Sequence, residues 1–370
     1  MELKFFQKSV LIIGGLLVVC LILEAGLRLF YPQNFQVHPP GMYTLDPAVG
    51  YVLTPGFKST MNRPEFQIDF STNNIGLRGL DPRSPKANTF RILVLGDSQT
   101  WGFGVADNET YPVQLEKLLI AHYRNRNIQV LNGGVPGYGT ADELAFLKSY
   151  GASLDPDLVI VQFLSVNDLR ENLTPASTWA NVVDGMLTTQ GLPPESNKEA
   201  APALGVRAQL WLKENSYLAR LALDLAGYMG TRIANLGKID ELWGEDFAQE
   251  DAILGQQLLV EITRTSSELG ARSLLLYTTG QAQVIQDTYD LPRSATVVAN
   301  AAKYTGTPWI DLAKQMQQRA DRHNLYYKQN GHWTPAGHRA VAEILTDEII
   351  KLGIIASFKE QYFCEYDTGS

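Results

Sequence analysis

The segment Phe90–Val105 constrains the fold more than any other part of this 370-residue chain. It reads FRILVLGDSQTWGFGV, so the apolar run Ile92–Leu95 ends abruptly in a Gly-Asp-Ser turn at Ser98. An amphipathic stretch, Tyr111–Tyr123, follows, and this order predicts a strand, a tight turn and a helix. Ser98 should therefore lie at the carboxyl end of a buried strand, where open α/β sheets place functional groups. A serine there acts as a nucleophile when a base and an oxyanion hole lie beside it.

Four more apolar runs are separated by helical patterns along the rest of the chain. These predicted strands are Ile128–Leu131, Leu158–Leu164, Ser273–Tyr277 and Trp309–Leu312. Such an alternation is typical of a parallel sheet with helices on both faces. The sequence therefore predicts a three-layer α/β/α fold with a parallel five-stranded sheet, closed by a last helix over Thr334–Leu352.

The 5 histidines of the chain offer one good candidate for a catalytic base. Thr334 and Pro335 form a helix-start signal, with threonine as N-cap and proline at the first helical position. His332 precedes this signal, so it lies on a loop from which its ring can reach a strand end. We interpret the other histidines as solvated or structural groups, namely His38, His122, His323 and His338.

Two loops at later strand ends could supply the donors of an oxyanion hole. A glycine-rich loop containing Gly137 follows the strand Ile128–Leu131, and glycine lets backbone N–H groups approach a ligand closely. Asn167 follows the strand Leu158–Leu164 and can donate its side-chain N–H. A turn glycine and a helix cap are the alternative interpretations. The placement of both residues at successive strand ends, together with Ser98, favours a shared site.

These segments resemble the characteristic sequence blocks of the SGNH (GDSL-like) hydrolase superfamily. The resemblance covers about residues 40–350 and implies the flavodoxin-like fold of that superfamily. It also implies Ser98 as nucleophile, His332 as general base, and an oxyanion hole formed by Ser98 N–H, Gly137 N–H and the Asn167 side chain. The matching blocks are Gly96-Asp97-Ser98-x-Thr100 with Gly102-x-Gly104-Val105, Val135-Pro136-Gly137, Asn167-Asp168 and Gly331-His332-Trp333-Thr334-Pro335-Ala336-Gly337-His338.

One position departs from the family pattern. Members of the superfamily normally carry an aspartate two or three residues before the base histidine, but Asn330 and Gln329 occupy those positions here. An asparagine can accept the imidazole N–H through its carbonyl oxygen, yet it brings no charge to stabilise the imidazolium. Replacing the aspartate of a serine-protease triad by asparagine lowers turnover by about 10⁴-fold. A working Ser98–His332 dyad, a slow enzyme and a protein that has lost catalysis are all compatible with Asn330.

Other kinds of chemistry find little support in the sequence. Cys20 and Cys364 are its two cysteines, so neither a zinc cluster nor a CxxC motif can form. The HExxH and Walker-type motifs do not occur. A net charge of −8 and a pI of about 5.3 argue against a nucleic-acid partner. We therefore expect no metal and no cofactor.

The N-terminus predicts a membrane anchor over residues 1–31. An uncharged run, Ser9–Leu23, is lengthened by apolar residues on both sides to about the 20 residues that a bilayer requires. Lys4 and Lys8 precede it, so the positive-inside rule keeps the N-terminus cytoplasmic. No small-residue cleavage pattern follows cleanly, which favours an uncleaved anchor over a cleaved signal peptide. Residues 5–31 would then hold the chain in a bacterial inner membrane, with the main body periplasmic.

The rest of the chain divides into three predicted parts. Residues 32–89 are rich in Pro, Gly and Asn and should form a small β-rich segment, with one strand at Phe66–Phe70. Arg78 in this segment is interpreted as half of a surface salt bridge, with substrate contact as the alternative. The hydrolase domain should span residues 90–356, and residues 357–370 should form a tail.

A helical insertion is expected within that domain at about residues 172–251. Apolar residues recur at helical spacing over Ala208–Ile233. Because the insertion directly follows Asn167, it is either a lid beside the site or an outer packing layer. Trp211 and Trp243 could stack on sugar rings, although tryptophans more often fill cores or surfaces.

Together, these observations predict a membrane-anchored, extracytoplasmic serine esterase. By analogy with similar anchored members of the superfamily, its substrates should be acyl esters, foremost acetyl esters, of cell-envelope or exported polysaccharide. An O-acyltransferase that acts on polysaccharide hydroxyls is a close alternative, because only the acceptor differs. A catalytically inactive glycan-binding or scaffold protein is the third possibility, motivated by Asn330.

Overall fold

The computed structural model describes residues 2–30, 38–63, 65–83, 86, 89–124, 127–178, 180–183, 186–188, 216–219, 221–222 and 247–355. The chain separates into two compact units. The smaller unit takes in residues 1–39, 62–64 and 193–238, and the larger unit holds the rest. Most of Ala208–Ile233, together with Trp211, Trp243 and the tail, lies outside the described residues, so the predictions for them stay predictions.

A helix, α1 (Glu2–Phe30), runs through the segment in which the sequence predicts a membrane anchor. Several of its apolar side chains are exposed, among them Leu16 and Leu21. In the same unit, the carboxylate of Glu24 accepts the backbone N–H groups of Tyr217 and Leu218. Within the described part of the chain, no helix has both the length and the apolar character that crossing a membrane requires.

Parallel strands form the central sheet of the larger unit, in the order β11-β10-β7-β5-β6. β5 and β7 are buried along their whole length, which explains why most of their residues are apolar; Arg91 in β5 and Gln162 in β7 are buried polar exceptions. The predicted parallel five-stranded sheet is confirmed. The strands are β5 (Thr89–Gly96), β6 (Asn127–Gly134), β7 (Leu158–Leu164), β10 (Arg272–Thr278) and β11 (Trp309–Asp311).

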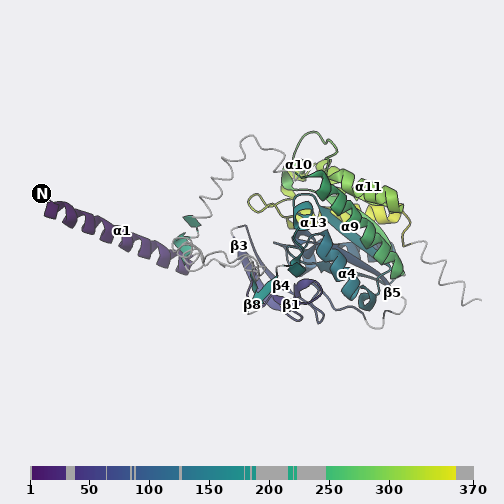
Figure 1. Cartoon of the computed structure of the whole chain (residues 1–370), viewed down its shortest axis with the longest axis horizontal. Helices are drawn as coiled ribbons and strands as arrows, with labels where there is room; N and C mark the ends of the chain where they lie inside the picture. The colour runs from purple at the N-terminus through teal and green to yellow at the C-terminus, as the bar shows by residue number, and fades with distance from the viewer. Residues whose placement is uncertain are drawn as a thin grey trace, which may run out of the picture. The chain divides into compact units, whose positions relative to one another are not determined.

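Helices flank this sheet, and the right-handed rule for parallel crossovers places them on both faces (Figure 1). The connections β5–α3–β6 and β6–α4–β7 run in opposite directions across the sheet, so α3 and α4 cover opposite faces. Further along the chain, α9 contacts α4 and α11, and α13 contacts α3 and α12. The longer helices are α3 (Tyr111–His122), α4 (Thr140–Leu154), α9 (Gln249–Glu268), α11 (Ala295–Thr305), α12 (Leu312–Gln317) and α13 (Pro335–Lys351).

Short helical turns connect these elements, and the last long helix begins at a capped residue. Thr334 caps α13 as predicted, because its hydroxyl accepts the N–H of Gly337 at 3.2 Å. The short turns are α2 (Ser98–Trp101), α5 (Asp168–Glu171), α10 (Gln281–Val284), η1 (Asp107–Glu109), η2 (Ala176–Thr178) and η3 (Arg322–Asn324).

The segment before β5 forms two antiparallel hairpins. β1 (Tyr43–Asp46) pairs with β2 (Gly50–Leu53), and β3 (Lys58–Arg63) pairs with β4 (Phe66–Ser71). Burial alternates along β4 as its sequence predicts, which confirms that strand. A third hairpin, β8 (Asn181–Val183) with β9 (Met186–Thr188), opens the expected insertion and was not predicted.

Candidate active site

Ser98 follows the carboxyl end of β5, where the local sequence forces a sharp change of direction. The carboxylate of Asp97 accepts the N–H of Gln99 at 2.8 Å and so caps α2, which starts at Ser98. The serine side chain is only partly buried, so its hydroxyl is accessible. Ser98 Oγ lies 2.8 Å from Nε2 of His332, a hydrogen-bond distance. The structure thus brings together two predicted site residues that are 234 positions apart.

His332 lies on the loop before α13, and that loop is tied to itself by backbone hydrogen bonds. Tyr327 N–H donates to the His332 carbonyl at 2.8 Å, and Gly331 N–H donates to the Tyr327 carbonyl at 3.1 Å. The imidazole packs against the ring of Phe103, with 4.5 Å between centroids. Burial lowers the pKa of His332 to about 4, an effect that a hydrogen bond to the backbone of Asn330 only partly offsets. The ring is therefore neutral at pH 7 and can accept a proton.

Asn330 stands beside the second ring nitrogen of His332. Its Oδ1 accepts the His332 backbone N–H at 2.9 Å and lies 3.3 Å from Nδ1. Because Nε2 must accept the hydrogen of Ser98, Nδ1 carries the ring proton and points it at this oxygen. The contact is longer than a typical N–H···O bond and brings no charge. Asn330 can therefore select the tautomer, but it stabilises the imidazolium far less than an aspartate would.

Gly137 and Asn167 follow the carboxyl ends of β6 and β7, the two strands that flank β5. Gly137 is exposed and has φ +86°, a conformation that other residues rarely adopt. Asn167 is the N-cap of α5, but its side chain makes no capping bond. Instead, its Nδ2 donates to Asp97 at 3.1 Å. Both candidate oxyanion donors thus follow the carboxyl ends of the strands on either side of β5, the strand that leads into Ser98.

Several buried carboxyl groups lie in the segments that follow the carboxyl ends of these strands. Burial raises the pKa of Asp97 and of Asp142 to about 6, and that of Glu171 to about 8. It also raises the pKa of Glu143 and Asp168 well above their usual range, with repulsion from neighbouring carboxylates such as Asp97 and Glu171 adding to the effect. Among the described residues, no cluster of histidine, cysteine, aspartate or glutamate is arranged to hold a metal ion.

Arg78 corrects one prediction from the sequence. It is 2% exposed, so the expected surface salt bridge is wrong. Its guanidinium pairs with Asp107 at 2.8 Å and donates to the carbonyls of Trp101, Gly102 and Val105. Because these carbonyls end α2 and form the following loop, Arg78 fixes the chain directly after Ser98. A buried arginine inside a polar, glycine-rich segment has no local sequence signal.

Tyr51 on β2 makes a second contact that the sequence did not predict, with the loop that contains Gly137. Its hydroxyl donates to the carbonyl of Pro136 at 2.8 Å, and the hydroxyl of Tyr138 donates back to the carbonyl of Tyr51. A Cβ added to Gly137 would come within 2.8 Å of the Tyr51 hydroxyl. The first hairpin thus shapes the loop that presents Gly137.

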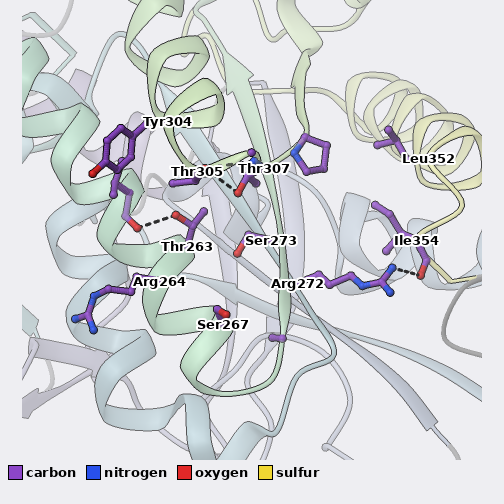
Figure 2. A pocket seen from close by; sticks show the side chains of 14 residues that line it. Thr263, Arg264, Ser267, Arg272, Ser273, Tyr304, Thr305, Thr307, Leu352 and Ile354 are labelled. Carbon is purple, nitrogen blue, oxygen red and sulfur yellow. Dashed lines mark hydrogen bonds between the residues drawn. The ribbon is translucent and has the colours of Figure 1, made fainter. Parts of the chain in front are cut away.

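A cavity of about 820 Å³ lies at the amino-terminal ends of β10 and β11, at the end of the sheet opposite Ser98 (Figure 2). It is lined by the start of β10, the end of α9 and the loop before β11. On one side, Arg272 donates to the carbonyl of Ile354 at 3.2 Å. Since Ser98, Gly137 and Asn167 follow the carboxyl ends of the strands, this cavity is separate from the candidate site.

The chain is similar to several known proteins over part of its length. A curated relative, the arylesterase of Vibrio mimicus, is 30% identical over 92 residues, which span 25% of this chain and 44% of that protein. A solved lipase/acylhydrolase from Enterococcus faecalis is 16% identical, with a TM-score of 0.40, and the match covers 70% of this chain and 94% of that one. An acetylxylan esterase from Geobacillus stearothermophilus is 15% identical, with a TM-score of 0.39, over 70% of this chain and 93% of that one.

The family assignment rests on a longer match. The sequence model of the GDSL-like Lipase/Acylhydrolase family matches residues 94–340, which is more than half of the chain and includes Ser98, Gly137, Asn167 and His332. The chain therefore belongs to the GDSL-like lipase/acylhydrolase family.

Proposed function

We propose that the protein is a serine esterase that uses the Ser98–His332 pair. Ser98 Oγ attacks the ester carbonyl carbon while His332 Nε2 takes the hydroxyl proton. The N–H groups of Ser98 and Gly137 and the side chain of Asn167 stabilise the oxyanion. The tetrahedral intermediate collapses, and the leaving alcohol takes the proton from His332. Water then cleaves the acyl-serine by the same route, which releases the acid and restores Ser98.

The observation that carries this proposal is the 2.8 Å contact between Ser98 Oγ and His332 Nε2. A neutral histidine at that distance is a competent general base for a serine. The lowered pKa of His332, about 4, keeps it neutral throughout the physiological range. The same low pKa makes the imidazolium costly during turnover, and Asn330 offers no charge to offset that cost. We therefore expect a working but slow enzyme.

The proposed substrates are short acyl esters, foremost acetyl esters, on cell-envelope or exported polysaccharide. Ser98, Asn167 and His332 are partly exposed and Gly137 is exposed, which leaves the site open to an ester carried on a large polymer. The proposed location is outside the cytoplasmic membrane, with residues 5–31 as the anchor. That location rests on the uncharged run Ser9–Leu23 and on the lysines before it.

Ester hydrolysis by the full-length protein in detergent tests the chemistry. p-Nitrophenyl acetate and butyrate should give a burst of p-nitrophenol that Ser98→Ala abolishes. Ser153→Ala, which removes an exposed hydroxyl on α4, should match wild type. Activity that survives in Ser98→Ala would refute the proposed nucleophile. An alkaline phosphatase fusion after residue 39, active only outside the cytoplasm, tests the location.

The acceptor in the second half-reaction decides between hydrolysis and O-acyl transfer. Because water and a sugar hydroxyl attack the same acyl-serine, the residues of the site serve both reactions. Partition of the acyl group between water and added oligosaccharide, measured by mass spectrometry, separates them. Acetate as the main product supports the esterase, and acylated oligosaccharide as the main product supports the transferase.

A further inference from the structure

The β3–β4 hairpin of the N-terminal segment reaches the loop that carries the candidate base. Glu65 lies directly before β4, and its two carboxylate oxygens accept the N–H groups of two successive residues. Oε1 binds Gln329 N–H and Oε2 binds Asn330 N–H, both at 3.0 Å. Hydrogen bonds to an ionised carboxylate are about twice as strong as neutral ones. Glu65 therefore binds two successive backbone amides, those of Gln329 and Asn330, through two hydrogen bonds.

That stretch is the one on which the orientation of His332 depends. Asn330 N–H is fixed by Glu65, and Asn330 Oδ1 in turn accepts His332 N–H at 2.9 Å and faces Nδ1 at 3.3 Å. Gln329 and Asn330 are exposed, so without Glu65 their amides would bond to water. The carboxylate thus ties Asn330, and through it the imidazole, to the β3–β4 hairpin.

The next residue adds an apolar contact at the same place. The ring of Phe66 meets Phe103 at 5.5 Å and Tyr327 at 5.2 Å between centroids. Phe103 in turn covers the imidazole of His332. The Tyr327 hydroxyl donates to the carbonyl of Gly104 at 2.8 Å, which joins the His332 loop to the loop after Ser98. Phe66 therefore packs where the nucleophile side and the base side of the site meet.

We infer that Glu65 is a positioning residue, which fixes the loop of Asn330 and His332 so that the imidazole stays within reach of Ser98. This inference rests on the proposed esterase activity for its catalytic readout, but not for its structural readout. It assigns a role to the N-terminal β-rich segment that the sequence of that segment does not suggest. The hold matters more here than with an aspartate at position 330, because Asn330 has no ionic attraction to His332.

Substitution of Glu65 by glutamine tests the inference directly. Glutamine keeps the size of the side chain, but its NH₂ group meets one backbone N–H as a second donor, so one of the two bonds is lost. We expect kcat for p-nitrophenyl acetate to fall about tenfold with KM within twofold, because a small misplacement of a catalytic group slows chemistry without changing binding. Glu65→Asp, which keeps the charge, should recover part of the loss.

Asp69→Asn is the matched control. Asp69 lies on β4, four residues after Glu65, and its carboxylate accepts the hydroxyl of Thr60 rather than any atom of the site. The change in charge on the hairpin is therefore the same, and kcat should equal that of wild type. If Glu65→Gln and Asp69→Asn lower kcat equally, the effect is one of hairpin charge, and the inference is wrong.

Amide hydrogen exchange separates this inference from the proposed function. The N–H groups of Gln329 and Asn330 should exchange at least tenfold faster in Glu65→Gln than in wild type or Asp69→Asn. Unchanged exchange would overturn the inference whatever the activity. Faster exchange with unchanged kcat would equally overturn the role in positioning for catalysis. A wild-type protein without esterase activity would refute the proposed function, while the exchange data would still decide whether Glu65 holds the loop.

Discussion

Asn330 sets the balance between a correctly oriented base and a poorly stabilised one. Its carbonyl oxygen serves two N–H groups, the backbone of His332 at 2.9 Å and Nδ1 at 3.3 Å. The shorter bond shapes the loop, and the longer one selects the tautomer. Because neither carries charge, the site keeps its geometry while it loses the electrostatic help that an aspartate gives. In an ordinary triad the aspartate both orients the histidine and stabilises the imidazolium by its charge. Asn330 can perform only the first of these two roles.

Asn330→Asp should raise kcat/KM for p-nitrophenyl acetate at pH 7 by about tenfold or more, well below the 10⁴-fold that a complete triad loses on the reverse change. The new carboxylate should also raise the pKa of His332 from about 4. Since the base must be neutral, activity is lost as pH falls through that pKa. The acid limb of the pH–rate profile should thus move to higher pH. A profile and rate equal to those of wild type would show that the asparagine does not limit turnover.

Gly137→Ala should lower kcat by about 10²-fold, the scale of losing one oxyanion donor. The added Cβ is strained at φ +86° and would come within 2.8 Å of the Tyr51 hydroxyl, so the loop must move. Gly306→Ala is the control, because Gly306 also has positive φ (+71°) but no atom lies within 4 Å of the place that its Cβ would take. Both variants should lose stability on urea unfolding, and only Gly137→Ala should lose activity. Normal turnover in Gly137→Ala would remove this N–H from the oxyanion hole.

At the scale of elements, the N-terminal segment braces the loops of the site. Arg78 binds the loop after Ser98, Tyr51 binds the loop of Gly137, and Glu65 binds the loop of His332. The loops of the site extend beyond the strands, so the hydrogen bonds of the sheet do not hold them in place. A second layer of short strands that bonds to those loops can hold them in place. This explains why the segment, whose own strands are short, contributes polar side chains to these loops, of which Arg78 and Tyr51 are buried.

Tyr51→Phe tests this brace at the Gly137 loop. The change leaves the buried Pro136 carbonyl without its 2.8 Å donor, which should lower the free energy of unfolding by about 1 kcal/mol and kcat several-fold. Tyr150→Phe is the control: it removes a hydroxyl that α4 donates to Asp46 on β1, away from the site. The control should lose stability but keep kcat. If both variants keep full kcat, the hairpin stabilises the fold without ordering the loop.

The sequence predicts the sheet and the main site residues because both depend on local patterns. Buried parallel strands give continuous apolar runs, and polar residues directly after those runs mark the functional edge, as Ser98 and Asn167 do. The brace could not be predicted in this way. Tyr51 meets a residue 85 positions away and Glu65 meets one 264 positions away. Such pairs depend on how the elements pack. Their residue types also occur in loops that make no such contact, so the sequence does not single them out.

At the scale of the whole molecule, buried carboxyl groups should make stability depend on pH. The pKa is raised to about 6 for Asp97 and Asp142, to about 8 for Glu171, and well above the usual range for Glu143 and Asp168. A raised pKa in the folded state means that stability is present at low pH and is lost as pH rises through the folded value. Each such proton changes the slope by about 1.4 kcal/mol per pH unit.

Two histidines act in the opposite direction but in a different pH range. Burial lowers the pKa of His332 to about 4 and that of His338 to about 3. Their unfolded forms take up protons below about pH 6.5, so they remove stability only as pH falls beneath that value. Between pH 6.5 and 8.5 the carboxyl groups with the most strongly raised pKa, such as Glu171 at about 8, therefore dominate the pH dependence. We expect the free energy of unfolding, measured with urea, to fall as pH rises through this window.

Glu143→Gln should flatten that dependence. Glu143 is 1% exposed, and burial raises its pKa, so the folded protein keeps a proton on it to higher pH than the unfolded chain does. A neutral glutamine removes this linkage and the repulsion that raises the pKa of Asp168. The variant should thus gain stability relative to wild type at pH 8.5 and gain little or nothing at pH 6.5. Glu268→Gln, an exposed change on α9, should leave the slope as it is. An unchanged slope in Glu143→Gln would mean that the interior carboxyl groups are ionised in the folded protein and that water or a cation compensates them.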